Sequence, residues 1–261
     1  MAALLASLAL LVGSPPPPNA PIPRAPSSLA TALETTTRSL VSAIDRWHPR
    51  NGRVPDDVTL YSLYQQRILI LLSERPQLSK AVFDRLGNAP TLRAEVLAKR
   101  ELGRLSKARP LSAFRTGPAA PADRLRGYYL AAQRRFGVAW NVLAAINYVE
   151  SAFNKLRSAS SAGAQGPMQF IPATWRAYGL GGNVHDPHDA ILGAANYLHA
   201  NGAPQNYRRA LYRYNPSWVY VDAVLRYAGA IRADPRAYYI FYSRQVFVRT
   251  PHGLVRLTGP R

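Results

Sequence analysis

Residues 144–174 read AAINYVESAFNKLRSASSAGAQGPMQFIPAT, and the rest of the chain is organised around this stretch. It begins as an apolar helix that carries one glutamate, Glu150, at or near its end. A loop of serine, alanine and glycine follows, and Pro172 stands where the first turn of a new helix accepts proline. Because Glu150 is the only glutamate after Glu101, a lone carboxylate on an apolar helix is the feature that most needs a chemical explanation.

Helical spacing places Glu150 on the same face as Leu143, Ile146 and Asn147. A carboxyl group on such a face loses water when the chain folds, and this raises its pKa above the ordinary value of about 4.3. A carboxyl group that is partly protonated near neutral pH can donate a proton to a leaving oxygen. The alternative interpretation is an ordinary glutamate that faces solvent at a helix end.

The surroundings of Glu150 favour a polymeric ligand. Residues 158–166 are mostly small, which lets a polymer approach the backbone closely. Gln169 offers an amide donor and acceptor that suit a sugar hydroxyl or acetamido group. Aromatic residues that could stack on sugar rings, or simply fill the core, are Tyr148, Phe153, Phe170, Trp175, Tyr178, Tyr212, Tyr214 and Trp218.

Composition limits the class of protein. A chain of 261 residues can hold one large domain, or one domain and a smaller partner. The net charge of +19 favours contact with polyanions such as nucleic acid, anionic lipid or acidic wall polymers, although it can also be a solvated basic surface. The chain has no cysteine and no recognisable nucleic-acid-binding motif. We therefore expect no disulfide, no thiolate metal site and no nucleic-acid partner.

Proline-rich stretches divide the chain into predicted regions. Residues 1–27 form a signal-like leader and a Pro-rich linker, in which Met1 to Val12 is apolar but too short to span a bilayer. No lysine or arginine precedes that apolar run, yet we favour export, with a secreted or cell-envelope location. Residues 28–107 read as a helical N-terminal region, and residues 108–122 as a second linker.

The remaining regions differ in their patterns. Residues 123–234 are predicted to form an α-helical domain, which contains the stretch around Glu150. Residues 235–261 read as a β-rich tail, with strands expected over Tyr238 to Val248 and Leu254 to Leu257. The predicted fold class is therefore mainly α, with a short β-hairpin at the C-terminal end.

The motifs within residues 123–234 resemble those of a known family. They are Glu150-Ser151-x-Phe153, Ser160-x-Ala162-Gly163-Ala164-x-Gly166-x-Met168-Gln169-Phe170-x-Pro172-x-Thr174, Tyr214-Asn215, Asp186-Pro187-x-Asp189-Ala190-Ile191, Ala194-Ala195-x-Tyr197-Leu198 and Tyr220-Val221. Together they resemble the lytic transglycosylases with a lysozyme-like fold. The segments after Tyr178 look closest to the membrane-bound murein transglycosylase B-like branch.

The resemblance implies an activity and a set of site residues. Glu150 would be the sole catalytic acid and then base, cleaving the bond between N-acetylmuramic acid and N-acetylglucosamine in peptidoglycan. The product would carry a 1,6-anhydro ring on the muramic acid. Ser160 and Gln169 match positions that hold the substrate near the scissile bond, and Tyr214 and Asn215 match a Tyr-Asn pair lining the same site. No cofactor is implied, and we expect a monomer that binds glycan strands and anionic wall polymers.

Three alternatives stay open at this stage. Most glycosidases use two carboxylates, so a muramidase that hydrolyses the same bond would need Asp186, Asp189 or Asp222 near Glu150. A wall-binding protein could keep the fold without catalysis, although the intact Glu150 and Gln169 speak against it. A basic nucleic-acid-binding protein would show a steep salt dependence of DNA binding and would leave peptidoglycan untouched.

Two departures from the family pattern are visible. The relatives' acidic, Asn/Gly-rich cation loop is reduced to residues 181–185, so we predict no structural calcium. His185, His188 and His199 read as surface or capping residues rather than metal ligands. Asn215 is followed by Pro216 rather than by the commoner His or Asn, which can shift the loop that carries it.

Overall fold

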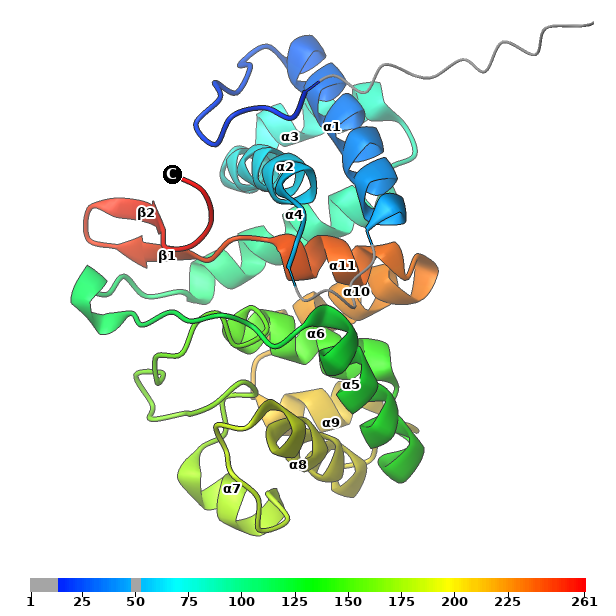
Figure 1. Ribbon diagram of the computed structural model, residues 1–261, viewed down its shortest axis with the longest axis vertical. Helices are drawn as coiled ribbons and strands as arrows, with labels where there is room; N and C mark the ends of the chain where they lie inside the picture. Colours follow the sequence, from blue (N-terminus) through cyan, green and yellow to red (C-terminus); the bar gives the residue numbers. More distant parts are fainter. Residues whose placement is uncertain (1–13, 48–52) are drawn as a thin grey trace, which may run out of the picture.

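The computed structural model describes residues 14–47 and 53–261, and it is mainly helical, as predicted (Figure 1). The predicted leader at residues 1–12 lies outside the described residues. Four helices form the N-terminal part: α1 (Pro26–Arg46), α2 (Asp56–Glu74), α3 (Pro76–Leu86) and α4 (Pro90–Leu105). The first three lie at the upper end in Figure 1, and α4 runs below them toward the middle of the molecule. None of the described helices has both the length and the apolar composition needed to cross a membrane.

The second part carries the stretch around Glu150. A short 3-10 turn, η2 (Leu111–Ala113), precedes it. Its helices are α5 (Ala122–Phe136), α6 (Trp140–Ser151), α7 (Pro172–Tyr178), α8 (Pro187–Ala200), α9 (Tyr207–Tyr214) and α10 (Trp218–Ala233). The chain then forms α11 (Arg236–Ser243) and the antiparallel strands β1 (Phe247–Thr250) and β2 (Gly253–Arg256).

The central helix is α6, which is apolar on all sides. Every residue from Val142 to Asn147 is buried, and α5, α8, α10 and α11 pack around the helix. A helix that is hydrophobic all round is stable in water only when other elements enclose it. This enclosure holds the body of α6 in the core and fixes the position of its last turn, where Glu150 is half-buried.

The C-terminal tail differs from its prediction over residues 236–243. The strand expected over Tyr238 to Val248 is wrong for this part, which forms α11, and β1 begins only at Phe247. Tyr238, Phe241 and Tyr242 have the i, i+3, i+4 spacing of a helix and are all buried. Their packing against the core outweighs the strand preference of aromatic residues. The predicted hairpin itself is confirmed, with Thr250 paired to Gly253 at its turn.

The largest core extends across both parts of the molecule. Leu40 and Ile44 of α1 and Val58 of α2 belong to the same buried cluster as the residues of α5, α6, α8 and α10. Helix α4 also packs along α10. The division into domains at residues 108–122 stays a prediction. The shared core does not separate the helices before this segment from those after it.

Arg244, just after α11, joins the tail to the N-terminal helices. Its side chain is 1% exposed and lies 3.1 Å from the carboxylate of Glu95 on α4. It also donates hydrogen bonds to the carbonyl of Ser62 and to Oε1 of Gln65 on α2. The buried guanidinium thus holds α2, α4 and the end of α11 together.

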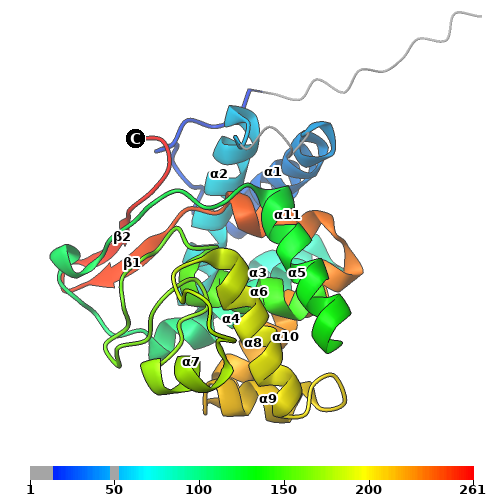
Figure 2. The ribbon, with the colours of Figure 1, turned by 60° about the horizontal axis from the view of Figure 1, so that its bottom comes forward.

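Residues 106–121, which we call the strap, run from α4 to α5 across one side of the molecule (Figure 2). The Arg109 amide donates to the carbonyl of Arg249 on β1. Further along, the Gly117 amide donates to the Lys155 carbonyl, and the Arg157 amide donates to the Arg115 carbonyl. The strap therefore links the hairpin to the loop that follows α6.

Candidate active site

A cleft of about 1150 Å³ opens beside the C-terminal end of α6. Its lining comes from the last turn of α6 and the loop after it, from the α9–α10 connection, and from α4 and β1 on the opposite side. Among the described residues, Glu74 and Glu150 are the carboxylates that line it. This combination of a large cleft and an enclosed acid makes it the candidate active site.

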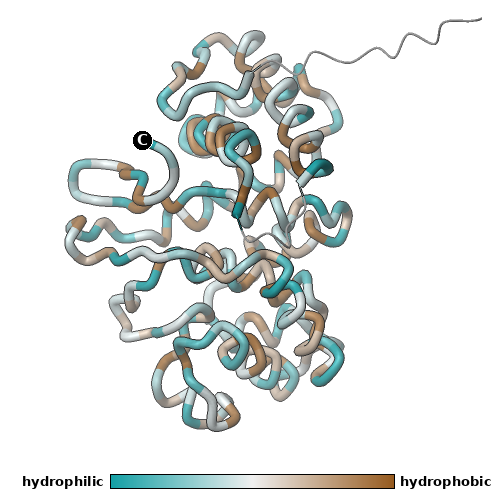
Figure 3. The backbone as a smooth tube through the Cα atoms, in the orientation of Figure 1, coloured by the Kyte–Doolittle hydropathy of each residue, from teal (hydrophilic) through white to brown (hydrophobic). Residues whose placement is uncertain are grey.

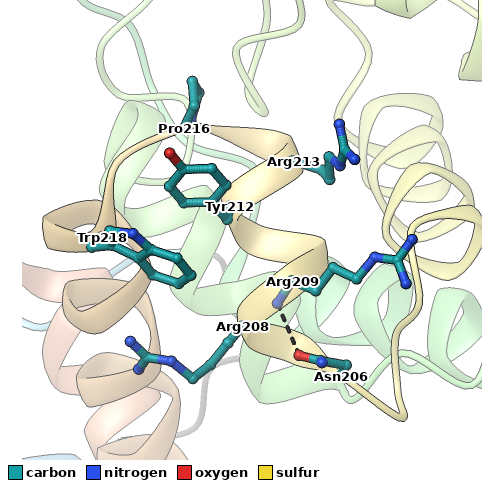
Figure 4. A pocket seen from close by; sticks show the side chains of 7 residues that line it. All are labelled: Asn206, Arg208, Arg209, Tyr212, Arg213, Pro216 and Trp218. Atoms are coloured by element: carbon teal, nitrogen blue, oxygen red, sulfur yellow. Dashed lines mark hydrogen bonds between the residues drawn. The ribbon is translucent and has the colours of Figure 1, made fainter.

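A second cavity, of about 770 Å³, lies against α9 and the start of α10 (Figure 4). In the part of the chain that the structure describes, no carboxylate lines this cavity. The indole of Trp218 is stacked on Tyr212, with ring centroids 4.4 Å apart, and the Arg208 guanidinium lies over the same indole. This cavity offers no acid among its lining residues, and the Trp218 indole is already in contact with Tyr212 and Arg208. We therefore do not take it as the candidate active site.

Glu150 is half-buried and hydrogen-bonded on one side. The hydroxyl of Tyr220 donates to Oε1 over 2.7 Å. Burial raises the pKa of Glu150 to about 7, and the hydrogen bond from Tyr220 opposes part of that rise. Oε2 has no hydrogen-bond partner within the described part of the chain. One oxygen is therefore fixed and the other is free to meet a ligand.

Tyr220 is the residue that the sequence did not assign to the site. It comes from the first turn of α10, 70 residues after Glu150, and its side chain is buried. Burial raises its pKa well above the ordinary value, and the nearby Glu150 carboxylate adds to the effect. Tyr220 is thus a neutral donor. Its place in a Tyr-Val motif was visible, but nothing in the spacing linked it to Glu150.

The backbone turns sharply after Glu150. Ala152, Phe153 and Asn154 all have positive φ angles, of 50°, 62° and 67°. Consecutive non-glycine residues in this region are strained and persist only when their surroundings hold them. Phe153 is fully buried, and the Asn154 amide donates to the Ser151 hydroxyl. The turn directs the chain from the helix end into the loop that lines the cleft.

Polar side chains of α6 fix the segment that carries Gln169. The Ser151 hydroxyl donates to the Pro167 carbonyl over 2.6 Å, and the Asn147 amide donates to the same carbonyl over 2.8 Å. The Tyr129 hydroxyl holds Asn147 in turn. These groups are buried, so each needs its partner. The network sets the distance between the helix of Glu150 and the loop of Gln169.

Gln169 lines the same cleft as Glu150. Its φ angle is 50°, and its side-chain amide donates to the Gly166 carbonyl over 3.0 Å. At Gly166, a Cβ atom would lie 1.9 Å from the Val184 carbonyl oxygen, so the close approach of these two loops requires glycine. The tight turn leaves the carbonyl oxygen of the Gln169 side chain available to a ligand.

The other predicted site residues have different positions. Ser160 lines the cleft and accepts hydrogen bonds from the amides of Ala162 and Ala164, which closes its own loop. Asn215 lines the cleft at the end of α9. Tyr214 is not among the lining residues, because its hydroxyl donates to the Met168 carbonyl behind the cleft. The structure thus brings together Glu150, Ser160, Gln169 and Asn215, with Tyr214 as their support.

The aspartates considered for a two-carboxylate mechanism do not line the cleft. Asp222 pairs with Arg208 at 2.6 Å. Asp186 caps α8 by accepting from two backbone amides, as its position before Pro187 predicts. Asp186, His188 and Asp189 bring ligand atoms within 4.8 Å of one another. Backbone amides and the His188–Asp189 contact already use these atoms, and the absence of a calcium site stays a prediction.

Residues 127–230 match the family model of the transglycosylase SLT domain. This chain contains a transglycosylase SLT domain. The match supports a lytic transglycosylase of the lysozyme-like type, whereas the membrane-bound branch within it stays a prediction. No curated protein and no solved structure matches the chain with significance.

The SLT domain supplies one side of the cleft. Glu150, Ser160, Gln169, Asn215 and Tyr220 all lie within it. The residues of α2, α4, the strap and the hairpin that line the opposite side lie outside residues 127–230. The cleft is therefore completed by parts of the chain that the family match does not include.

Proposed function

We propose that this protein is a peptidoglycan lytic transglycosylase that cleaves the bond between N-acetylmuramic acid and N-acetylglucosamine. The observation that carries the proposal is the single half-buried carboxyl group of Glu150, with a pKa of about 7, in a large cleft of an SLT domain. At neutral pH about half of such groups hold a proton, which is the state that a general acid needs.

Glu150 acts first as an acid. Tyr220 engages Oε1, so Oε2 presents the proton to the glycosidic oxygen. The bond between that oxygen and C1 of the muramic acid breaks, and positive charge develops at the sugar ring. The carboxylate that remains is stabilised by the hydrogen bond from Tyr220, which lowers the pKa at the moment when the proton leaves.

Glu150 acts next as a base. Its carboxylate takes the proton from the C6 hydroxyl of the same muramic acid, and O6 attacks C1 to close a 1,6-anhydro ring. Glu150 is then protonated again, and no water is consumed. Gln169, Ser160 and Asn215 line the same cleft and are suited to hydrogen-bond the acetamido and hydroxyl groups that orient the sugar.

The charge distribution favours this route over hydrolysis. Retaining and inverting hydrolases need a second carboxylate within about 5–10 Å of the acid. Within the described residues, the other carboxylate of the cleft is Glu74, at the end of α2. The pKa of Glu150 is set by burial and by the hydrogen bond from Tyr220, and Glu74 is not among its causes. An intramolecular nucleophile removes the need for that second group. A substrate in the wall also fits the predicted envelope or secreted location.

The test is mass spectrometry of muropeptides that the protein releases from purified sacculi. We expect products lighter by one water than reducing-end muropeptides, and we expect Glu150→Gln to release none. The matched control is Glu74→Gln, which changes the other carboxylate of the cleft on an exposed helix end and should retain the products.

Other outcomes point to the alternatives. Reducing-end products that incorporate ¹⁸O from labelled water would mean hydrolysis and would overturn the single-carboxylate mechanism. Binding to sacculi without any release by the wild-type protein would mean a wall-binding protein.

A further inference from the structure

The two sides of the cleft carry opposite charge. On the SLT side, Glu150 is the one charged residue among the described lining residues. The opposite side, outside residues 127–230, has one carboxylate and six cations. These residues are Glu74, Lys99, Arg100, Arg104, Lys107, Arg109 and Arg249. A cleft with one cationic wall favours a ligand that is neutral along one edge and anionic along the other.

Three of the six cations already have partners that explain them. Lys99 lies 3.5 Å from the buried carboxylate of Glu95. Arg100 donates to the carbonyls of Leu72 and Ser73, where α2 ends. Arg109 donates to the Ala159 carbonyl and lies over the Phe114 ring. These three cations hold the wall together.

The other three cations have no such partner. Among the described residues, no ion pair, side-chain hydrogen bond or aromatic ring engages Arg104, Lys107 or Arg249, and we call these three residues the basic wall. Arg104 and Lys107 are exposed. The guanidinium of Arg249 lies over Gly103, next to Arg104. Arg104 lies in the last turn of α4, where a cation interacts favourably with the helix dipole. This interaction does not explain Lys107, which lies on the strap, or Arg249, which lies on β1.

The basic wall is fixed relative to the catalytic side. Arg109 binds the Arg249 carbonyl through its own amide and the Ala159 carbonyl through its guanidinium. Ala159 precedes Ser160, which lines the cleft with Glu150. A glycan strand that lies along Glu150 therefore shares the cleft with the three cations of the basic wall.

We propose that the basic wall binds the carboxylates of the peptides carried by the glycan strand, so that the enzyme prefers peptide-substituted strands over bare glycan. This inference rests on the proposed function. In peptidoglycan, the muramic acid that reacts also carries the peptide, so a strand seated on Glu150 brings its carboxylates into the same cleft. The neutral sugars then face the SLT side, and the peptides face the cations.

The test compares cleavage of soluble peptide-bearing strands with cleavage of the same strands after enzymatic removal of their peptides. The variant is Arg104→Gln/Lys107→Gln/Arg249→Gln. We expect the ratio of kcat/KM between the two substrates to fall about tenfold in this variant. In the wild type the same ratio should fall as salt is raised, because exposed charges are screened.

A matched control removes three exposed arginines elsewhere: Arg134→Gln/Arg209→Gln/Arg213→Gln. Arg134 lies on α5, and Arg209 and Arg213 line the second cavity (Figure 4). This variant has the same net charge as the basic-wall variant, and its substrate ratio should equal that of the wild type. An equal fall in both variants would assign the effect to net charge and overturn the proposal.

Remaining outcomes separate this proposal from the proposed function. If the wild type cleaves neither substrate, the proposed function fails. If it cleaves both equally and the basic-wall variant is unchanged, the preference for peptides fails while the activity stands. A further comparison uses sacculi with their phosphate polymers and sacculi from which acid has removed them. If the basic-wall variant differs from the wild type only on sacculi that keep these polymers, the basic wall binds phosphate and the proposal is overturned.

Discussion

Glu95 on α4 and Glu150 on α6 are both carboxyl groups withdrawn from water, yet different groups face them. Glu95 is 3% exposed and meets the guanidinium of Arg244 at 3.1 Å and the ammonium of Lys99 at 3.5 Å. Among the described residues, Glu150 meets no cation and has one hydrogen bond, from Tyr220. Burial with a cation keeps a carboxylate as a structural link, whereas burial without one raises the pKa to about 7 and leaves a proton to be transferred.

The largest expected effect separates the two glutamates by function. Glu150→Gln should lower kcat by about 10²- to 10⁴-fold, because it removes the proposed general acid and base. Glu95→Gln should lower stability but leave the turnover per folded molecule close to that of the wild type. The measurement is the initial rate of muropeptide release, normalised to the folded fraction from circular dichroism. Equal losses per folded molecule in both variants would break the comparison.

The next effect concerns the structural role of Glu95. Arg244→Met should reduce the free energy of unfolding by about 3–5 kcal/mol, because it leaves the Glu95 carboxylate buried with only Lys99 near it. The double variant Arg244→Met/Glu95→Leu should recover much of that loss, since apolar residues can replace a buried ion pair. Urea denaturation of both variants measures this difference. A double variant no more stable than Arg244→Met would contradict it.

A smaller effect appears in the dependence of stability on pH. The folded state holds the Glu150 proton up to about pH 7, whereas the unfolded chain releases it near pH 4.5. The folded state therefore binds more protons between these values, and the wild type loses stability as pH rises through this window. Glu150→Gln lacks this titration. Its free energy of unfolding minus that of the wild type should therefore be larger at pH 8 than at pH 4, by on the order of 1–3 kcal/mol.

Thermal unfolding of the two proteins across this range measures that gain. The other titrating groups are common to both proteins and cancel in the difference. A constant difference in melting temperature from pH 4 to pH 8 would mean that the pKa of Glu150 is not raised.

The smallest effect is a shift in the pH profile of the reaction. The proposed mechanism needs protonated Glu150, so the rate should fall as pH rises through its pKa. The hydrogen bond from Tyr220 lowers that pKa, so Tyr220→Phe should move the falling limb to higher pH, with a loss in kcat of about tenfold or less. Tyr227→Phe, which changes another buried tyrosine of the cleft, is the control. A limb that stays in place, or moves to lower pH, would contradict the assigned role of Tyr220.

The same comparison explains what the sequence could and could not reveal. The apolar face of α6 and the loop after it predicted an enclosed glutamate, and Pro172 predicted the first turn of the helix that is α7. One partner of each glutamate was hidden because it is distant in sequence: Tyr220 lies 70 residues from Glu150, and Arg244 lies 149 residues from Glu95.

Two further features depended on tertiary packing. Residues 236–243 look like a strand by composition, and only the helical spacing of Tyr238, Phe241 and Tyr242 could have identified α11. The cationic side of the cleft was visible only as a high net charge spread along the chain. Folding brings α4, the strap and β1 to one place, and no local pattern records that arrangement.

The packing of α11 has a consequence for the order of events during synthesis. Tyr238 and Phe241 lie against Phe153 and Tyr148, which stand on either side of Glu150 in the sequence. Since α11 follows the SLT domain in the chain, the ribosome releases Glu150 before the helix that covers its aromatic neighbours. A nascent chain that ends at residue 230 thus carries Glu150 without the aromatic packing that α11 supplies. The packing around Glu150 is therefore complete only after α11 has emerged from the ribosome and docked.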